Sequence, residues 1–378
     1  MKTPWTVKLA LLLTSTLTMM SGTAIIASLP MIKEHFAHVE GIAILSKLIL
    51  TAPALAVVIF APFSHSIASH LGKKKTLLIA TFFFGVFGLM GGFLETVSGI
   101  ILSRLMFGIG SAIIMSVALS LVGDYMQGEE RTAYLGFQAS FAALGGVIFM
   151  SGGGMLSEIS WQAAFYIYGF AFIVLLVNGL FLYEPKSLHV KQEEALEPLH
   201  VKRHWPVFLT GFLTISIFYM VPTQLPYVLH ETYGMSGGEV GTLIATVTLV
   251  ASISAWFYKR LRRRFSIFYI YSILLLAQAV GFTGISQSWN YLSFNIALIA
   301  TGIGVGLVFV NTSSWLLERA HTKERLKATG ILSSSIFLGQ FASPVLAEPF
   351  IRLMGVQQTF GAVAVVLAVA GAMIIINE

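Results

Sequence analysis

Long apolar runs, each followed by a short polar stretch, repeat along the whole chain of 378 residues. Runs of 18 or more apolar residues are typical of transmembrane helices, because about 20 helical residues cross the hydrocarbon core of a bilayer. Each run must be helical, since lipid offers no partner for unpaired backbone groups. The pattern predicts an all-α membrane protein with twelve transmembrane helices. Their predicted bounds are 7–30, 42–64, 76–94, 97–122, 132–157, 162–183, 205–229, 239–258, 265–286, 290–316, 328–349 and 357–376.

The longest polar stretch, residues 184–204, divides the predicted helices into two sets of six. A weak internal repeat supports this division. A basic loop at 72–75 joins the second and third spans, and another at 259–264 joins the eighth and ninth. Two six-span halves related by a parallel repeat are a known plan of transporters. We therefore expect an N-terminal six-helix half at 1–183, a linker at 184–204 and a C-terminal six-helix half at 205–378.

Lysine and arginine are distributed unevenly between the two sides of the predicted helices. With the N-terminus in the cytoplasm, 19 of the 23 Lys and Arg residues fall on the cytoplasmic side, whereas only Lys33 and Arg352 fall in outer loops. Lys47 and Arg104 fall within spans. Cytoplasmic loops of membrane proteins carry excess positive charge, so this bias fixes the orientation. We expect a multi-pass protein of the bacterial inner membrane with both termini and the linker in the cytoplasm.

Composition narrows the class of protein further. The chain is 56% hydrophobic and 11% charged, whereas soluble domains are about 25% charged. Its net charge of +6 sits in short loops and not on one polar face, which favours a lipid bilayer over nucleic acid as the partner. The chain has no Cys, which excludes disulfides and thiolate metal sites. No phosphate loop, zinc-binding helix or serine elbow is present, so we expect no enzyme and no cofactor.

One cluster in the first outer loop resembles a metal site only loosely. His35 and His38 stand beside Glu34 and Glu40. Their spacing matches no standard zinc site, so a solvated loop is the favoured interpretation and no metal is predicted.

Several local motifs stand at corresponding places in the two-half arrangement. They are the stretch 65–74 ending in Gly72-Lys73-Lys74, the fourth-span sequence Arg104-Leu105-Met106-Phe107-Gly108 followed by Asp124, the fifth-span glycines Gly136, Gly145, Gly153 and Gly154, and Trp161 with Phe165. With these motifs the chain resembles the major facilitator superfamily over nearly its whole length. Within that family it is most similar to the twelve-span drug:proton antiporter group, which includes bicyclomycin, tetracycline and arabinose exporters. The resemblance implies the major facilitator fold.

The resemblance also implies gating residues. The family's loop reads Gly-x-Leu-x-Asp-Arg-x-Gly-Arg-Lys, so Gly72 and Lys73 match, whereas Ser69 replaces the acid that helps to latch the cytoplasmic side. Asp124 remains as the acidic partner. A cytoplasmic gate at Gly72, Lys73 and Asp124 is therefore expected, with a weaker latch than usual unless His65 or His70 supplies hydrogen bonds.

The fifth-span motif is eroded as well. Residues 149–150 are Phe-Met where the family has Gly-Pro, so the usual proline kink is expected to be absent. Gly145, Gly153 and Gly154 have two interpretations: they allow close helix packing, or they form a sliding or bending face that takes part in gating.

Polar residues inside the spans are candidates for cargo binding or coupling. Lys47 and Arg104 are costly in a membrane, so each faces protein or water unless it extends to the interface. Gln224 and Tyr227 share a stretch with two prolines, where a broken helix gives access to a cavity. Further candidates, any of which can instead be an ordinary interhelical hydrogen bond, are Asn178, Tyr219, Gln278, Asn295, Asn311 and Gln340, with Phe141, Phe107 and Phe337 as possible apolar walls.

The leading functional hypothesis is a monomeric secondary active transporter that exports a small solute by alternating access, coupled to proton influx. No predicted span has a carboxylate near its middle, so neutral, zwitterionic or anionic cargo is favoured over cations. An uncoupled facilitator, or an importer of a small anionic or zwitterionic metabolite, is the near alternative. A membrane-embedded sensor is the alternative from another class, but it needs a large soluble domain that the chain does not show.

Overall fold

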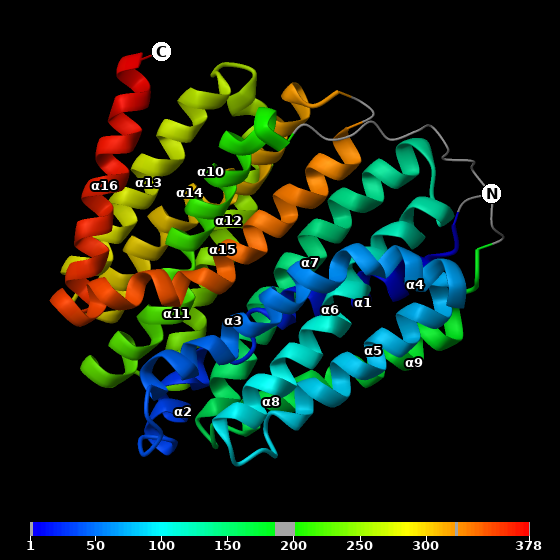
Figure 1. Ribbon diagram of the computed structural model, residues 1–378, viewed down its shortest axis with the longest axis horizontal. Helices are drawn as coiled ribbons and strands as arrows, with labels where there is room; N and C mark the ends of the chain where they lie inside the picture. Colours follow the sequence, from blue (N-terminus) through cyan, green and yellow to red (C-terminus); the bar gives the residue numbers. More distant parts are fainter. Residues whose placement is uncertain (1–2, 186–200, 322–323, 378) are drawn as a thin grey trace. The chain divides into compact units, whose positions relative to one another are not determined.

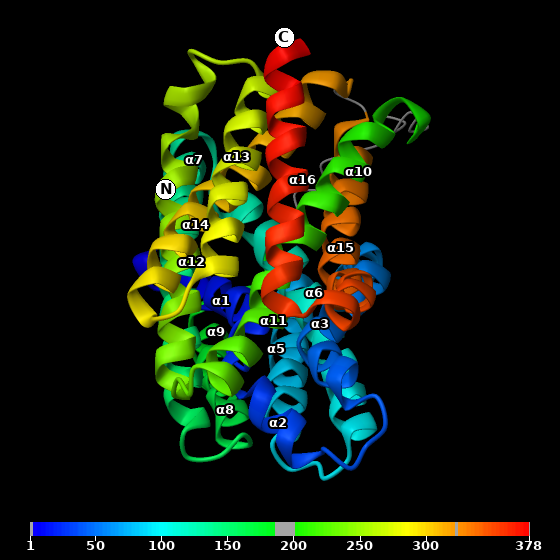
Figure 2. The ribbon, with the colours of Figure 1, turned by 90° about the vertical axis from the view of Figure 1, so that its left-hand side faces the viewer.

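The computed structural model describes residues 3–185, 201–321 and 324–377, and these segments consist of helices and short turns without a strand. Figure 1 shows the ribbon, and Figure 2 shows it turned by 90°. The chain forms two compact units. Unit 1 comprises Met1–Val190 and Ser236–Gly241, and unit 2 comprises Lys191–Met235 and Thr242–Glu378.

Unit 1 contains the first six helical runs, of which three are interrupted by short turns or 3₁₀ segments. They are α1 (Trp5–Ser21), η1 (Ile26–Ser28) and α2 (Leu29–His35); α3 (Ile42–Phe60), η2 (Ala61–Phe63) and α4 (Ser64–Leu71); α5 (Lys73–Met90); α6 (Val97–Tyr125); α7 (Gly128–Ser157); and α8 (Ala163–Tyr166), η3 (Ile167–Gly169) and α9 (Phe170–Phe181).

Unit 2 contains the second six runs. They are α10 (Val201–Phe218), α11 (Met220–Tyr227) and the π-helical segment η4 (Val228–Thr232); α12 (Gly237–Arg262), whose first residues belong to unit 1; α13 (Ile267–Gln287); α14 (Tyr291–Arg319); α15 (Arg325–Met354); and α16 (Val356–Asn377). Within this unit α13 packs against both α14 and α16 (Figure 2).

The helical runs correspond one by one to the predicted spans, which confirms the all-α membrane fold. Among the described residues, eleven runs are long and apolar enough to cross a membrane. The twelfth is α5, whose 18 residues include three lysines in its first turn. Large apolar side chains such as Ile148 and Leu176, 65% and 64% exposed, cover the outer faces, as expected where lipid is the solvent.

The structure corrects the prediction at four places, one of which is the basic loop predicted at 259–264, because α12 continues to Arg262. The first span is interrupted after Ser21 and resumes at Ile26. The basic loop predicted at 72–75 is wrong, because α4 runs to Leu71 and α5 begins at Lys73, so that Gly72 alone lies between them. Residues 201–204, predicted as linker, begin α10. Glu184 and Pro185 of the predicted linker are also described, and residues 186–200 lie outside the described segments. Helix α7 is continuous over 30 residues, in line with the missing proline.

Glycines on α6 hold three helices of unit 1 close together. A Cβ at Gly108 would lie 2.6 Å from the Pro53 carbonyl oxygen of α3, and a Cβ at Gly110 would lie 3.0 Å from the Ala80 carbonyl oxygen of α5. Residues two apart on a helix point in nearly opposite directions, since each turn has 3.6 residues. One glycine therefore lets α3 approach α6, and the next lets α5 approach its other side.

The same arrangement recurs in unit 2 with a fixed offset. A Cβ at Gly302 of α14 would lie 2.9 Å from the Val247 carbonyl oxygen of α12, and a Cβ at Gly304 would lie 2.7 Å from the Leu274 carbonyl oxygen of α13. Each of these four residues stands 194 positions after its counterpart in unit 1: 108 and 302, 53 and 247, 110 and 304, 80 and 274. Helices α6 and α14 also begin and end 194 positions apart, behind the N-caps Thr96 and Asn290. The weak repeat in the sequence is thus a residue-by-residue repeat of packing.

Candidate functional site

Arg104, on α6, is enclosed within unit 1 and does not extend to its surface. Its side chain is 0% exposed. Nη2 donates hydrogen bonds to the Ser21 carbonyl oxygen at 3.2 Å and to the Tyr168 hydroxyl at 3.0 Å. The guanidinium carbon lies 4.1 Å from the centre of the Phe107 ring and 4.8 Å from that of Tyr168, which gives favourable cation–π contact.

The Arg104 guanidinium is only partly satisfied by these contacts. Its Nε and Nη1 atoms have no hydrogen-bond partner among the described residues, although a buried charge is costly unless it is paired. Lys47, on α3, is also buried at 5% exposure. Unit 1 therefore encloses two basic side chains, and neither is exposed at the surface of the described structure.

The predicted latch residues meet at the turn between α4 and α5. Lys73 Nζ lies 2.5 Å from Asp124 Oδ2, which joins α5 to the end of α6. Gly72 has a φ of +88°, a backbone conformation that favours glycine. The His70 ring bonds the Ser66 carbonyl oxygen of its own helix at 2.7 Å, and so it does not replace the missing acid.

A carboxylate that the sequence analysis missed takes part in this turn. Glu184 accepts hydrogen bonds from the backbone N–H groups of Lys73 at 2.6 Å and Lys74 at 2.9 Å. A Cβ at Gly72 would lie 2.9 Å from Glu184 Oε2. A carboxylate at a helix N-terminus satisfies free N–H groups and interacts favourably with the helix dipole. Glu184 thus ties the chain after α9 to the start of α5, and the only signal for it was an acid directly after a span.

The α7 glycines occupy close-packed positions within unit 1. A Cβ at Gly145 would lie 2.8 Å from Thr16 Cγ2 of α1, and Gly153 faces the Ala24 carbonyl so closely that no side chain fits. A Cβ at Gly154 would lie 3.2 Å from the Gly241 Cα atom, in the first turns of α12. By contrast, nothing lies within 4 Å of the Cβ position of Gly136. Three of the four glycines are therefore required for helix packing.

The side-chain amide of Gln224 is buried without a local hydrogen-bond partner among the described residues. Helix α10 ends at Phe218 and α11 begins at Met220, so the predicted break occurs just before the two prolines. Gln224 on α11 is 0% exposed, and neither amide atom has a described partner. Tyr227, one turn further, is buried at 5% exposure. A buried polar group left unpaired costs about 1–3 kcal/mol, so Gln224 is available to a ligand in a way that a bonded side chain is not.

Among the other candidates in unit 2, Asn311 differs from Gln224 in this respect and Gln278 does not. Asn311 is fully bonded: its Oδ1 accepts from the Tyr258 hydroxyl at 3.1 Å and its Nδ2 donates to the Ile267 carbonyl at 3.0 Å. This favours the interhelical hydrogen-bond interpretation for Asn311. Gln278 on α13 is 0% exposed and has no partner for either amide atom, whereas Gln340 on α15 is buried at 8% exposure.

Two candidates in unit 1 lie in contrasting surroundings. Asn178 on α9 is bonded to Thr14 of α1 at 2.9 Å, which again favours the interhelical interpretation. Phe141 on α7 is half-buried, and its ring centre lies 6.3 Å from that of Phe137.

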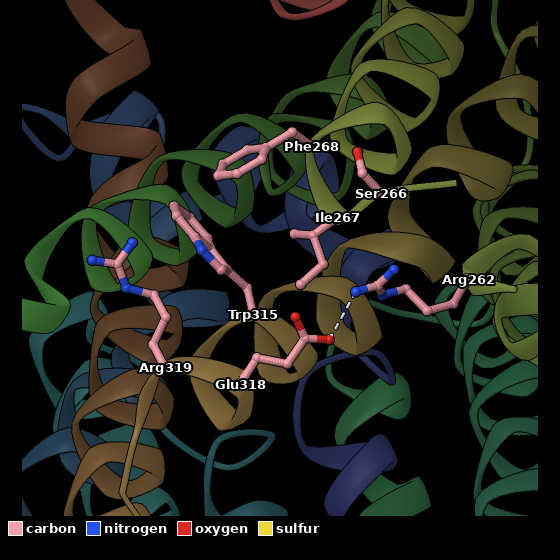
Figure 3. A pocket seen from close by; sticks show the side chains of 7 residues that line it. All are labelled: Arg262, Ser266, Ile267, Phe268, Trp315, Glu318 and Arg319. Carbon is pink, nitrogen blue, oxygen red and sulfur yellow. Dashed lines mark hydrogen bonds and ion pairs between the residues drawn. The ribbon is translucent and has the colours of Figure 1, made fainter. Parts of the chain in front are cut away.

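The described cavities lie near the loops and not at the middle of the spans. One, of about 390 Å³, lies in unit 2 between the α12–α13 turn and the end of α14. Figure 3 shows Arg262 and Glu318 joined at one wall, with the rings of Trp315 and Phe268 at another. A second, of about 470 Å³, lies in unit 1 beside Phe36 and Thr96. Among the described residues no group of three His, Cys, Asp or Glu side chains is placed to hold a metal.

Comparison with known proteins identifies the family. A model of the Major Facilitator Superfamily matches residues 11–322 and 207–377. The quinolone resistance protein NorA of Staphylococcus aureus (strain MRSA252) is 24% identical over 313 residues, which cover 79% of each chain. Multidrug resistance protein 1 of Bacillus subtilis (strain 168) is 22% identical and covers 78% of this chain and 77% of its own.

A solved structure shares the fold. The crystal structure of the nucleoside transporter NupG superposes with a TM-score of 0.81 at 14% identity, covering 98% of this chain and 99% of that one. The matched family and relatives are membrane transporters and not enzymes. The chain belongs to the Major Facilitator Superfamily, and it is a multi-pass membrane transporter of small molecules.

Proposed function

We propose that this transporter is a monomeric exporter that moves a small solute out of the cell by alternating access while protons flow inward. The observation that carries the proposal is the match, over 79% of both chains, to a protein named for quinolone resistance, because resistance to a drug follows from its removal. The similarity to NupG concerns the fold alone and gives no direction of transport.

The charges of unit 1 support a preference for cargo that carries a negative group. Lys47 and Arg104 are buried in unit 1, whereas the described carboxylates of that unit are exposed or partly exposed. In a low-dielectric interior the partly unpaired Arg104 guanidinium creates a positive potential that repels cations and attracts anions. A quinolone antibiotic bears a carboxylate, and many also bear a basic amine, so zwitterionic quinolones fit this potential.

Gln224 is our first choice for a polar contact with the cargo. Its free amide supplies one donor and one acceptor group, and Tyr227 and Gln340 add polar tips from α11 and α15. Phe141 offers an apolar face in unit 1. Asn311 can contact the cargo only if the cargo displaces one of the two hydrogen bonds that its side chain makes.

The contacts at the α4–α5 turn support a gating role for Gly72, Lys73 and Asp124, with Glu184 as an added tie. The Lys73–Asp124 pair joins the start of α5 to the end of α6, so its loss would loosen this turn. We place this turn in the cytoplasm with both termini, and the protein in the inner membrane, because of the positive residues on that side. Gly145, Gly153 and Gly154 would let α7 slide against its neighbours without side-chain collision.

One observation favours a second candidate, an uncoupled facilitator. Proton-coupled carriers of cations use an acid within the membrane, and the described spans hold none near their middle. Without such a group a carrier equilibrates its cargo down a gradient. The test below separates the two functions.

The decisive experiment is transport by purified protein in liposomes, with and without an imposed difference of one pH unit. The panel consists of a fluoroquinolone with a basic amine, a quinolone carboxylate without one, and ethidium. One-for-one exchange with protons allows accumulation up to about tenfold, because one pH unit corresponds to 1.36 kcal/mol. Gradient-driven accumulation of the two quinolones, but not of ethidium, is expected. Equilibration without accumulation would support the facilitator, and preference for ethidium would contradict the charge argument.

A further inference from the structure

A buried pair of ionisable side chains joins two helices of unit 2. His204 lies in the first turn of α10, and Glu324 is the N-cap residue of α15. They are 0% and 2% exposed. His204 Nε2 lies 3.3 Å from Glu324 Oε2, and Nδ1 of the same ring has no described partner. The Lys73–Asp124 pair, by comparison, is partly exposed.

Apolar side chains seal the pair on the side toward the span. One turn further along each helix lie Val207, Phe208 and Ala328, which belong to a buried cluster with Leu316 and Leu332. The centre of the Phe208 ring lies 6.4 Å from that of His204. Water therefore has no route to the pair through this cluster.

Two arginines near the pair donate hydrogen bonds to backbone oxygens. Arg319 at the end of α14 donates to the Arg203 carbonyl oxygen, and Arg325 donates to the Ala320 and Leu317 carbonyl oxygens. Among the described residues, His204 is the one side chain that bonds the Glu324 carboxylate. The other titratable or charged groups on the adjoining turns of α10, α14 and α15 are Lys202, Glu318, His321 and Lys327.

One bound proton makes the net charge of the His204–Glu324 pair zero. Removing a carboxylate or an imidazolium from water costs several kcal/mol unless its charge is compensated. With one proton held between Nε2 and Oε2, the pair is neutral overall. Loss of that proton leaves a lone carboxylate in a dry contact. The contact then has to admit water, which requires the ends of α10 and α15 to separate.

We propose that His204 and Glu324 form a proton-binding site whose occupancy keeps the ends of α10 and α15 packed together. The site binds a proton and no other ligand. Its place in a transport cycle rests on the proposed coupling to protons, since a site that opens when its proton leaves couples proton release to movement of α15. The binding site itself is independent of any cargo.

The absence of native cysteine allows a direct test on the full-length purified protein. Ala328, 0% exposed, donates its N–H to the Glu324 carbonyl oxygen, so Ala328→Cys reports the opening of this contact through its reaction with a maleimide. The rate is divided by that of Lys259→Cys, an exposed position, because the thiolate fraction of both rises with pH. From pH 6 to pH 9 the ratio should rise at least tenfold in the parent chain.

Substitutions of His204 and Glu324 test whether the pH dependence of labelling arises from this pair. In Glu324→Gln, which keeps a neutral hydrogen-bonding group, the ratio should stay low and change less than twofold with pH. In His204→Gln, which removes the proton-sharing ring, the ratio should already be high at pH 6. His321→Gln, an exposed neighbour, should behave as the parent. A flat ratio in the parent, an unchanged rise in Glu324→Gln, or a lost rise in His321→Gln would overturn the proposal.

A transport measurement separates this proposal from the proposed function. If the labelling ratio rises as expected while the pH gradient drives no transport, the proton site stands and the coupling fails. If the ratio is flat while the gradient drives accumulation, export stands and the proton is bound elsewhere.

Discussion

Replacing Gly304 by alanine tests the close packing of α13 against α14. The added Cβ would lie 2.6 Å from Gln278 Cγ and 2.7 Å from the Leu274 carbonyl oxygen. The backbone atom cannot move without shifting α13, so the substitution carries an overpacking cost of about 1–3 kcal/mol. At the same time alanine has a higher helix propensity than glycine by about 1 kcal/mol.

Gly330→Ala is the matched control, because it separates these two effects. Gly330 lies inside α15, in the same unit, and nothing lies within 4 Å of its Cβ position. Both substitutions gain the same helix propensity, so the difference between them equals the packing cost at Gly304. At roughly 2–4 °C per kcal/mol for a unit of this size, the melting midpoint of Gly304→Ala should lie about 2–12 °C below that of Gly330→Ala.

The assay is thermal denaturation of purified protein followed by tryptophan fluorescence. The chain has six Trp and no Cys, so dyes that react with thiols report nothing. If Gly304→Ala melts at or above the temperature of Gly330→Ala, α13 and α14 are not in the close contact described. Gly110→Ala, whose Cβ would meet Ala80 at 3.0 Å, should show a smaller loss.

Three further predictions concern the charges. Arg104→Ala should lower the initial rate of transport per folded molecule about tenfold or more, because a hydrogen bond from a charged group to the cargo contributes about 1.5–3 kcal/mol. Arg352→Ala, at an exposed position, should leave the rate unchanged, and equal effects of both would remove Arg104 from the site. Glu184→Ala should remove the cap on α5 and lower the melting midpoint by the equivalent of about 0.5–2 kcal/mol. The same fluorescence assay measures this change, and an unchanged midpoint would mean that the cap does not form. Added from outside to intact cells, a membrane-impermeant thiol reagent should label Ser236→Cys and spare Gln192→Cys, and the reverse pattern would invert the topology.

The positions of the spans could be predicted from hydrophobicity alone, because lipid requires a complete apolar helix wherever the chain crosses. The same reasoning fails where a helix leaves the bilayer. The stretch from His65 to Leu71 is polar enough to look like a loop, yet it is helical, since helix formation does not end where hydrophobicity does. The break after Ser21 lies within an apolar run and carries no proline to mark it.

The pairing of side chains was harder to predict than their burial. The cost of a charge in lipid already indicated that Arg104 is special, and the Lys73–Asp124 contact followed from a family motif. Tyr168 and Glu184 were missed because each meets its partner across a long stretch of sequence, 64 residues for Tyr168 and more than 100 for Glu184. A single sequence carries no signal for such contacts beyond residue type.

Because the packing repeats with a period of 194 residues, a position in one copy can be compared with its counterpart in the other copy of the same chain. At the two close contacts 108/302 and 110/304 both copies keep glycine, and at the end of α6 and α14 both keep an acid, Asp124 and Glu318. The buried cations break this symmetry, since the counterparts of Lys47 and Arg104 are Gly241 and Leu298. If those charges served the duplicated architecture, the second copy would need them as well. Their absence there confines the two buried basic side chains to one copy of an otherwise shared framework, which is what a role outside the packing of that framework predicts.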